Sequence, residues 1–261
     1  MCSGFEKMLR LERINKNFGG LPALQEVSCE IAGGSVTALI GPNGAGKSTL
    51  INCISGILAP DQGAIRFSGQ DLAGRPAHEI ARLGIGRTFQ NLKVFPRMTV
   101  LENVLCGLTL DAGKSWISAM LRLPGLRHRE RHLRLRALAA LDRFGLANKA
   151  GWPAQALAYG DRKRLELARA FVGEPLLVLL DEPVAGLNAK ETSQIGAEIQ
   201  KLRSEGQTLL LVEHDMDLVM SVADRVVVLD GGRCIAQGTP QEVQRNPLVI
   251  EAYLGSMEPT A

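Results

Sequence analysis

The stretch from Gly41 to Thr49 constrains the fold of this 261-residue chain more than any other. It reads GPNGAGKST and fits the pattern G-x-x-x-x-G-K-[ST]. The apolar run Val36–Ile40 precedes it and a segment with helical character, Ser48–Ile57, follows it, so the required strand-loop-helix context is present. Glycines let several backbone N–H groups point at one anion, and the helix adds its positive end. The sequence therefore predicts a phosphate-binding loop and not an ordinary glycine-rich turn.

Two side chains of the loop suit a nucleotide and its metal ion. We expect Lys47 to reach the β- and γ-phosphates and Ser48 to ligate Mg²⁺. The other residues of the loop are predicted to contribute to the phosphate cradle: Gly41, Pro42, Asn43, Gly44, Ala45, Gly46 and Thr49.

An apolar strand that ends in acids is the second strong signal. Leu176–Leu180 run directly into Asp181 and Glu182. A buried parallel strand delivers such residues to the carboxyl edge of its sheet, where open α/β folds bind ligands. Asp181 is suited to hold Mg²⁺ together with Ser48, and Glu182 to polarise the attacking water as a general base. The alternative is a capped strand end without chemistry, which the phosphate loop upstream disfavours.

The run Thr208–Val212 also ends in polar residues, Glu213-His214-Asp215. His214 is therefore predicted at the same sheet edge as Glu182. A lone histidine is usually structural, but at this edge we interpret His214 as a contact to the γ-phosphate.

Composition narrows the class of protein. The hydrophobic fraction of 46% allows a buried core, and a net charge of +3 is too mild to indicate a nucleic-acid partner. Five cysteines without ligand-like spacing suggest reduced thiols in a cytosolic protein, not disulfides or a zinc site. No apolar run reaches the length of a membrane span, and the first ten residues lack the apolar region of a secretion signal.

The remaining pattern predicts strands around the phosphate loop and helices elsewhere. Thr99 and Glu102 form a capping box that starts a helix. We expect an antiparallel layer beside the nucleotide, a C-terminal hairpin, and a helical tail. The predicted segments are strands at 9–14, 27–31 and 64–69, hairpin strands at 226–229 and 233–236, and a helix over 242–253.

Residues 110–146 are mostly helical in pattern and basic in charge, and Pro124-Gly125 is expected to break them into two pieces. Between residues 122 and 136, six arginines and two histidines stand against Glu130 as the one acid. The segment is either a solvated helix face or a surface near anionic lipid headgroups or a membrane partner.

The ordered motifs resemble the nucleotide-binding subunit of ABC transporters over nearly the whole chain. Gly41–Thr49 resembles the Walker A motif of that family, and Leu176–Glu182 resembles its Walker B motif with the catalytic glutamate. The resemblance implies roles for three further residues: Phe18 stacks on adenine, Gln90 senses the metal and water and contacts the membrane subunit, and His214 is the switch histidine.

The signature motif departs from the usual pattern of the family. Residues 157–161 read LAYGD where LSGGQ is usual, and Asn188 stands where the following loop usually ends in aspartate. The resemblance implies that four residues face the ATP of a partner subunit: Ala158, Tyr159, Gly160 and Asp161. Ala158 lacks the serine hydroxyl that grips the γ-phosphate in the family. Asp161 either repels the nucleotide or simply favours the start of a helix.

The details of several motifs are similar to one branch, the ATP-binding subunits of branched-chain amino-acid importers. This resemblance implies a RecA-like α/β core of P-loop NTPase type, with an antiparallel β layer and a helical subdomain at roughly 92–166 within one domain spanning 1–261. It further implies Mg·ATP hydrolysis that drives import, at the cytoplasmic face of the inner membrane. The partners expected are a second ATPase subunit, two membrane permease subunits and, indirectly, a periplasmic binding protein.

Other functions stay open at this stage. Amides or urea are alternative substrates. A DNA-repair ATPase uses the same cassette but needs long coiled-coil arms, and the chain sustains no heptads. A translation-associated protein has two cassettes, whereas this chain has one phosphate loop. A non-hydrolysing binding module is disfavoured by the intact Lys47, Asp181, Glu182 and His214.

Overall fold

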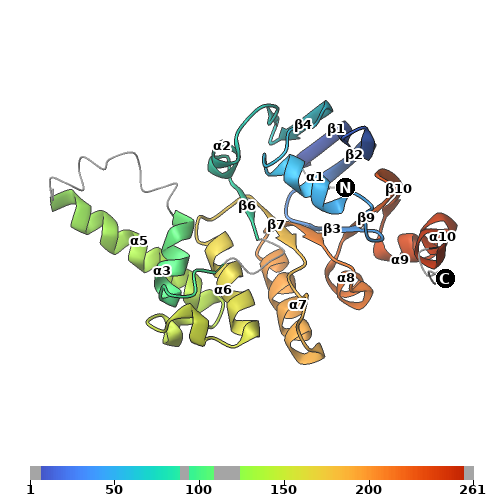
Figure 1. The fold of residues 1–261 in the computed structure, drawn as a ribbon. Coiled ribbons are helices and arrows are strands. Elements are labelled where there is room, and N and C mark those ends of the chain that lie inside the picture. The colour runs from blue at the N-terminus through green and yellow to red at the C-terminus, as the bar shows by residue number, and fades with distance from the viewer. Residues whose placement is uncertain (1–6, 89–93, 109–123, 256–261) are drawn as a thin grey trace, which may run out of the picture.

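Two β-sheets form the centre of the molecule, and most of the helices lie beside the six-stranded sheet (Figure 1). The structure is a computed structural model, and it describes residues 7–88, 94–108 and 124–255.

The six-stranded sheet has the order β10-β9-β3-β8-β7-β6, with β10 antiparallel to β9 and the other neighbours parallel. Its central strands β3, β8 and β7 are buried at every position, because both faces of a parallel sheet are covered. The strands are β3 (Val36–Ile40), β6 (Ile85–Arg87), β7 (Leu177–Asp181), β8 (Thr208–Val212), β9 (Arg225–Asp230) and β10 (Arg233–Gly238).

The four-stranded antiparallel sheet has the order β2-β1-β4-β5. Its strands β1 and β2 form a long hairpin through Gly19 and Gly20, both at positive φ. The strands are β1 (Lys7–Phe18), β2 (Leu21–Ala32), β4 (Gln62–Phe67) and β5 (Gln70–Asp71). One buried cluster joins this sheet to one face of the six-stranded sheet and to the phosphate-loop helix, with Leu11, Ile51 and Leu179 among its members.

A group of helices lies to one side of the sheets, seen at the left of Figure 1. They share a buried core with the other face of the parallel sheet, to which Leu141, Phe171 and Leu180 belong. The group comprises α3 (Val100–Leu105), α5 (Pro124–Arg143), α6 (Tyr159–Phe171) and the short 3₁₀ turns at 106–108, 147–149 and 154–156.

The other helices flank the strands of the core. They are α1 (Lys47–Ile54), α2 (Ala77–Arg82), α7 (Ala189–Ser204), α8 (Met216–Val222), α9 (Pro240–Gln244) and α10 (Pro247–Gly255). A third buried cluster joins α8, α9 and α10 to β3 and β9.

The predicted fold class is confirmed, including the antiparallel layer and the C-terminal hairpin. The capping box at Thr99 is present, with the Thr99 side chain and Glu102 bonding each other's backbone N–H groups. Pro124 and Gly125 are the first residues of α5, because proline fits the first turn of a helix. Residues 109–123 lie outside the described part of the chain, so the expected break between two helical pieces stays a prediction. One local expectation was wrong. The tail is split into α9 and α10, because Pro247 cannot continue a helix and starts a new one.

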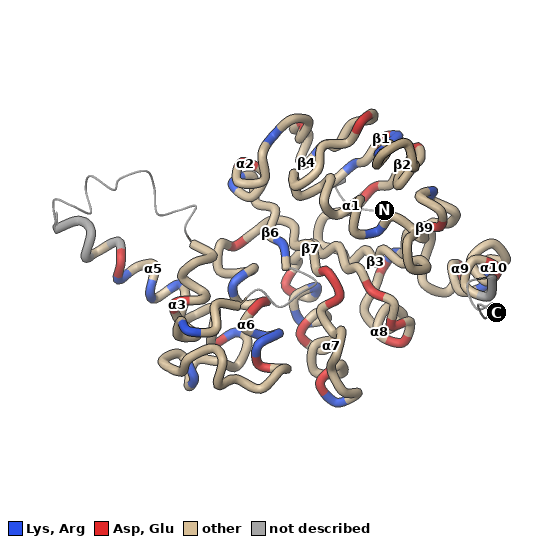
Figure 2. Tube along the Cα trace, viewed as in Figure 1, with Lys and Arg blue, Asp and Glu red and all other residues tan. Residues whose placement is uncertain are grey.

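Helix α5 extends away from the body of the molecule, and Figure 2 shows basic residues along it. Arg131 and Arg134 are exposed. Arg136 packs back on the body, donating to the carbonyl of Val172 at 3.1 Å. Arg136 therefore has a structural contact, while the role of the exposed basic face stays a prediction.

Candidate functional site

The phosphate loop is set between β3 and α1 by its glycines. Gly41, Gly44 and Gly46 all have positive φ, at 147°, 81° and 98°. A Cβ on Gly41 would lie 2.0 Å from the carbonyl oxygen of Leu229, so no side chain fits there. Gly46 is the N-cap of α1, which directs the free N–H groups of the helix into the loop.

Lys47 is the first residue of α1 and folds over the loop that precedes it. Its Nζ donates to the carbonyl oxygens of Gly41 at 2.6 Å and Pro42 at 2.9 Å. Burial lowers the pKa of Lys47, while the charges of Glu182 and Asp181 oppose that shift. The ammonium group thus lies in the field of the predicted general base, Glu182, and of the predicted metal ligand, Asp181.

The carboxyl ends of β7 and β8 bring the predicted acids and histidine together. Asp181 is in register with Val212 in the parallel pair, so Glu182 and His214 follow at the same edge. His214 Nδ1 lies 4.0 Å from Glu182 Oε1 and 3.8 Å from Glu213 Oε2. The Glu182 side chain is 22% exposed and that of His214 65% exposed, which leaves both accessible to a nucleotide.

Glu182 has a left-handed backbone, with φ of 49°. Hydrogen bonds on both sides of the residue fix this conformation. Its N–H donates to Val212 at 3.0 Å, and its carbonyl accepts from the N–H of Ala185 at 3.2 Å and from Lys163 Nζ at 3.1 Å. A strained residue held by its surroundings is common where a side chain must be aimed for function.

Asp181 is nearly buried, and its carboxylate contacts a cation. Arg87 Nη2 donates to Asp181 Oδ2 at 3.2 Å, and the side chains are 12% and 3% exposed. Burial raises the pKa of Asp181, and the Arg87 charge and hydrogen bond oppose that shift. Asp181 Oδ1 is buried and has no hydrogen-bond partner among the described residues.

That orphan oxygen fits a divalent cation, because buried carboxylate oxygens need a partner and Mg²⁺ prefers oxygen ligands. The described residues contain no group of three or more His, Cys, Asp or Glu side chains able to hold a metal by themselves. In nucleotide sites Mg²⁺ is commonly bound through one or two carboxylates together with the phosphates. Ser48 is exposed in the first turn of α1, so its hydroxyl is available as a second ligand.

The signature residues form the start of α6. Ala158 is the N-cap and offers no side-chain hydrogen bond. The hydroxyl of Tyr159 donates to the carbonyl of Ala185 at 3.1 Å, which ties the signature to the loop after Glu182. Gly160 lies against Glu191 of α7, since a Cβ there would be 2.8 Å from its Oε1.

Asp161 is paired with two cations of its own chain. Lys149 Nζ is hydrogen-bonded to Oδ2, and Arg164 Nη1 is 3.4 Å from Oδ1. The side chain of Asp161 is 15% exposed. These contacts favour the interpretation that Asp161 stabilises the start of α6, and not the one in which it repels the nucleotide.

One predicted site residue lies on the antiparallel layer, away from the acids and the histidine. Phe18 is at the end of β1, 47% exposed, with Lys16 Nζ 5.8 Å from its ring centroid. Its ring is therefore accessible, and its adenine contact stays a prediction. Gln90 lies outside the described residues.

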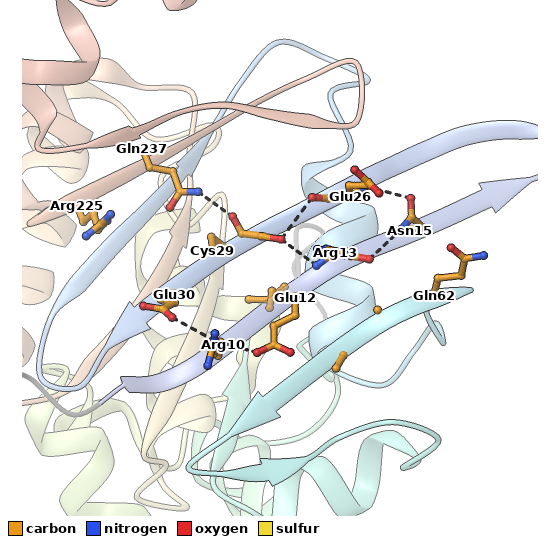
Figure 3. A pocket seen from close by; sticks show the side chains of 14 residues that line it. Arg10, Glu12, Arg13, Asn15, Glu26, Cys29, Glu30, Gln62, Arg225 and Gln237 are labelled. Carbon is orange, nitrogen blue, oxygen red and sulfur yellow. Dashed lines mark hydrogen bonds and ion pairs between the residues drawn. The ribbon is translucent and has the colours of Figure 1, made fainter.

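A cavity of about 880 Å³ lies elsewhere, on the antiparallel layer (Figure 3). It is lined by β1, β2 and β4, with Arg225 and Gln237 from β9 and β10. Its charges are of both signs, and Arg10 pairs with Glu12 at 2.9 Å and Glu30 at 3.2 Å. No residue of the phosphate loop lines it, so this cavity is separate from the candidate nucleotide site.

Sequence reasoning missed Arg87 and Lys163, which contact Asp181 and the carbonyl of Glu182. Arg87 lies three positions before Gln90 in the segment RLGIGRTFQ. Lys163 lies in the basic run of α6. In both segments, the sequence pattern does not show which of the neighbouring basic side chains turns inward and which stay exposed.

Sequence comparisons agree with the geometry. The profile of the family described as "ABC transporter" matches residues 24–185, and that of "Branched-chain amino acid ATP-binding cassette transporter" matches residues 233–258. The chain is 43% identical to the high-affinity branched-chain amino acid transport ATP-binding protein BraF of Pseudomonas aeruginosa, covering 95% of this chain and 98% of that protein. It is 43% identical to LivG of Escherichia coli K12, covering 96% and 98%.

Solved structures give the same result. A crystal structure of the ADP conformation of an ATP-binding cassette of an ABC transporter is similar with a TM-score of 0.84 and 34% identity, covering 96% of this chain and 99% of that one. A dimeric cassette in a post-hydrolysis state, bound to ADP and Pi, has a TM-score of 0.75 and 26% identity, covering 89% and 99%. Among the residues that the structure describes, no helix has the length and apolarity to cross a membrane.

Proposed function

The chain belongs to the ABC transporter family, and we propose that its ATPase activity drives the import of branched-chain amino acids. It binds nucleotide and hydrolyses ATP. The substrate class rests on the relatives, which are named as branched-chain amino acid transport proteins, and on the C-terminal match at 233–258.

The observation that supports ATP hydrolysis best is that one edge of the parallel sheet brings together the phosphate loop, the predicted metal ligand, and the predicted general base with its neighbouring histidine. The phosphate loop follows β3, Asp181 ends β7, and Glu182 and His214 stand together at the ends of β7 and β8. Lys47 and the N–H groups of the loop bind the phosphates. Glu182 accepts a proton from the attacking water, and His214 contacts the γ-phosphate from the adjoining strand end.

Ser48 and Asp181 are the residues that would hold Mg²⁺, with Gln90 as a third candidate. When bound, the ion neutralises charge on the β- and γ-phosphates. Two neighbouring residues contact Asp181: Arg87 Nη2 donates to one carboxylate oxygen, and Thr88 Oγ1 accepts from the Asp181 N–H at 3.1 Å.

We infer that two ATPase subunits meet head to tail, so that the signature of each chain completes the site of the other. The dimeric cassette among the structural relatives supports this arrangement. The start of α6, where Ala158 and Tyr159 are exposed, then faces the partner's nucleotide. The dimer sits under two membrane permease subunits at the cytoplasmic face of the inner membrane, fed by a periplasmic binding protein.

The decisive experiment is transport by the assembled complex. Membrane subunits that co-purify with this chain are reconstituted in lipid vesicles. ATP is supplied on the side of the membrane that carries this chain, and movement of labelled leucine to that side is measured. We expect uptake that requires ATP and is lost in the Lys47→Ala variant. Uptake of amides or urea in place of leucine would support the alternative substrate class. Failure to co-purify with any membrane protein, with ATPase activity intact, would favour a non-transport cassette.

A further inference from the structure

A partly buried arginine connects the phosphate-loop helix to the predicted metal ligand. Arg87 ends β6, beside β7. Its Nη1 donates to Asn52 Oδ1 and to Ser55 Oγ, each at 2.8 Å. Its Nη2 donates to Asp181 Oδ2 at 3.2 Å.

The contacts at the α1 end fix the guanidinium plane. Asn52 belongs to α1, and Ser55 is its C-cap. The Ser55 hydroxyl donates to the carbonyl of Ile51 at 2.9 Å, so its oxygen is free to accept from Arg87. A planar guanidinium held at one end presents the other end in a fixed direction.

Asp181 is fixed by hydrogen bonds at both its backbone and its side chain. Its N–H donates to Thr88 Oγ1, one carboxylate oxygen is bound by Arg87, and Oδ1 is left buried without a hydrogen-bond partner among the described residues. A lysine in place of Arg87 would supply a positive charge, but its single ammonium group could not hydrogen-bond α1 and Asp181 with two separate nitrogens as the guanidinium does.

We propose that Arg87 is a positioning residue for the metal, holding Oδ2 of Asp181 so that Oδ1 is presented to Mg²⁺. This rests on the proposed metal-binding role of Asp181. Groups that orient a ligating carboxylate from outside the coordination shell typically contribute 10–100-fold to metal affinity. Because the same guanidinium is bonded to α1, it also fixes Asp181 relative to the helix that carries Ser48.

The experiment must distinguish two roles of Arg87: supporting the local packing, and orienting the Asp181 carboxylate toward the metal. Arg87 lines a cavity of about 410 Å³ together with Ile80, Phe95 and Gly107, so its loss can disturb that wall without affecting the metal. The readout must therefore be metal binding, compared with nucleotide binding in the absence of metal.

The test measures Mn²⁺ binding by electron paramagnetic resonance in the presence of a non-hydrolysable ATP analogue. We expect Arg87→Gln to weaken Mn²⁺ binding by about 10-fold, with a smaller loss in Arg87→Lys. Affinity for the analogue in EDTA should stay within about 2-fold of wild type. Arg66→Gln is the matched control, because Arg66 lies on β4 with its side chain 49% exposed and loses the same charge.

The possible outcomes distinguish the role of Arg87 from the metal site itself. Unchanged Mn²⁺ affinity in Arg87→Gln, with binding lost in Asp181→Asn, would overturn the role of Arg87 alone. Unchanged affinity in Asp181→Asn would overturn the metal site. If Arg87→Gln does not fold, Asn52→Ala combined with Ser55→Ala removes both acceptors of Nη1 while keeping the charge of Arg87, and an affinity equal to wild type there would contradict the proposal.

Discussion

The ammonium group of Lys163 donates to the backbone carbonyl of Glu182 at 3.1 Å, joining α6 to the proposed general base of the same chain. Lys163 is 3% exposed although it carries a charge. It lies in α6, whose first residues form the signature motif. The left-handed backbone of Glu182 is therefore held in part by the helix that begins with the signature motif.

Replacing Lys163 should reduce turnover more than nucleotide binding. Lys163→Met keeps the apolar stem but removes a hydrogen bond from a charged group, worth about 1.5–3 kcal/mol. With Glu182 less well aimed, we expect kcat for ATP to fall by roughly 10-fold, with KM within about 2-fold. Steady-state ATPase of the assembled transporter measures both. Lys201→Met, on the exposed face of α7, is the control, and equal kcat in the two variants would contradict this role.

Glu182→Gln should block hydrolysis while ATP still binds. The amide keeps the shape of the carboxylate but has no basicity, so turnover should drop by about 10²-fold or more. Equilibrium binding of labelled ATP should stay near wild type. Near-normal hydrolysis in the assembled complex would show that another group is the base.

Two glycines of the phosphate loop should differ sharply when replaced by alanine. A Cβ on Gly41 meets the Leu229 carbonyl at 2.0 Å, whereas a Cβ on Gly44 meets nothing within 4 Å. Gly44→Ala should cost about 1 kcal/mol for its left-handed φ alone, and Gly41→Ala about 3 kcal/mol or more because the backbone must move. Thermal unfolding without nucleotide measures this, and equal losses would mean that the clash with Leu229 does not decide the cost.

The buried thiols should resist alkylation in the folded chain. Burial raises the pKa of Cys29 to about 12 and that of Cys53 to about 11. Since the thiolate is the nucleophile, its fraction at pH 8 is only about 10⁻⁴ for Cys29 and about 10⁻³ for Cys53. Mass spectrometry after iodoacetamide should show both unmodified, and labelled only after denaturation. Rapid labelling of Cys29 at pH 8 would contradict its burial.

The sequence predicted those parts of the site that follow from strand ends and glycine spacing. Glu182 and His214 met at one edge because parallel strands align their carboxyl ends. The contacts of Arg87 and Lys163 could not be predicted, because they depend on which face of β6 or α6 is buried in the assembled core. The extent of β1 and β2 was also underestimated, since bulges at Arg13 and Glu26 interrupt the alternation of apolar residues.

The two signature substitutions in this chain should have different consequences. Ala158 lacks a hydroxyl, and a lost hydrogen bond to a charged group is worth about 1.5–3 kcal/mol. Asp161, in contrast, has its charge paired with Lys149 and Arg164, and an acid in the first turn of a helix stabilises it by about 0.3–1 kcal/mol. We therefore expect the missing hydroxyl, and not the extra charge, to weaken the ATP site that this chain completes for its partner.

In the proposed head-to-tail dimer, the Glu182→Gln variant isolates the second ATP site, because the remaining ATPase activity there depends on the partner's catalytic residues and on this chain's signature motif. Adding Ala158→Ser should raise the residual activity by roughly 10-fold. Adding Asp161→Gln should change it by less than about 2-fold while lowering the stability of the chain by about 1 kcal/mol. A rise with Asp161→Gln alone would mean that its carboxylate repels the nucleotide despite its ion pairs. No response to either change, with equal losses when the catalytic glutamate is removed from either subunit, would mean that the two ATP sites are equivalent.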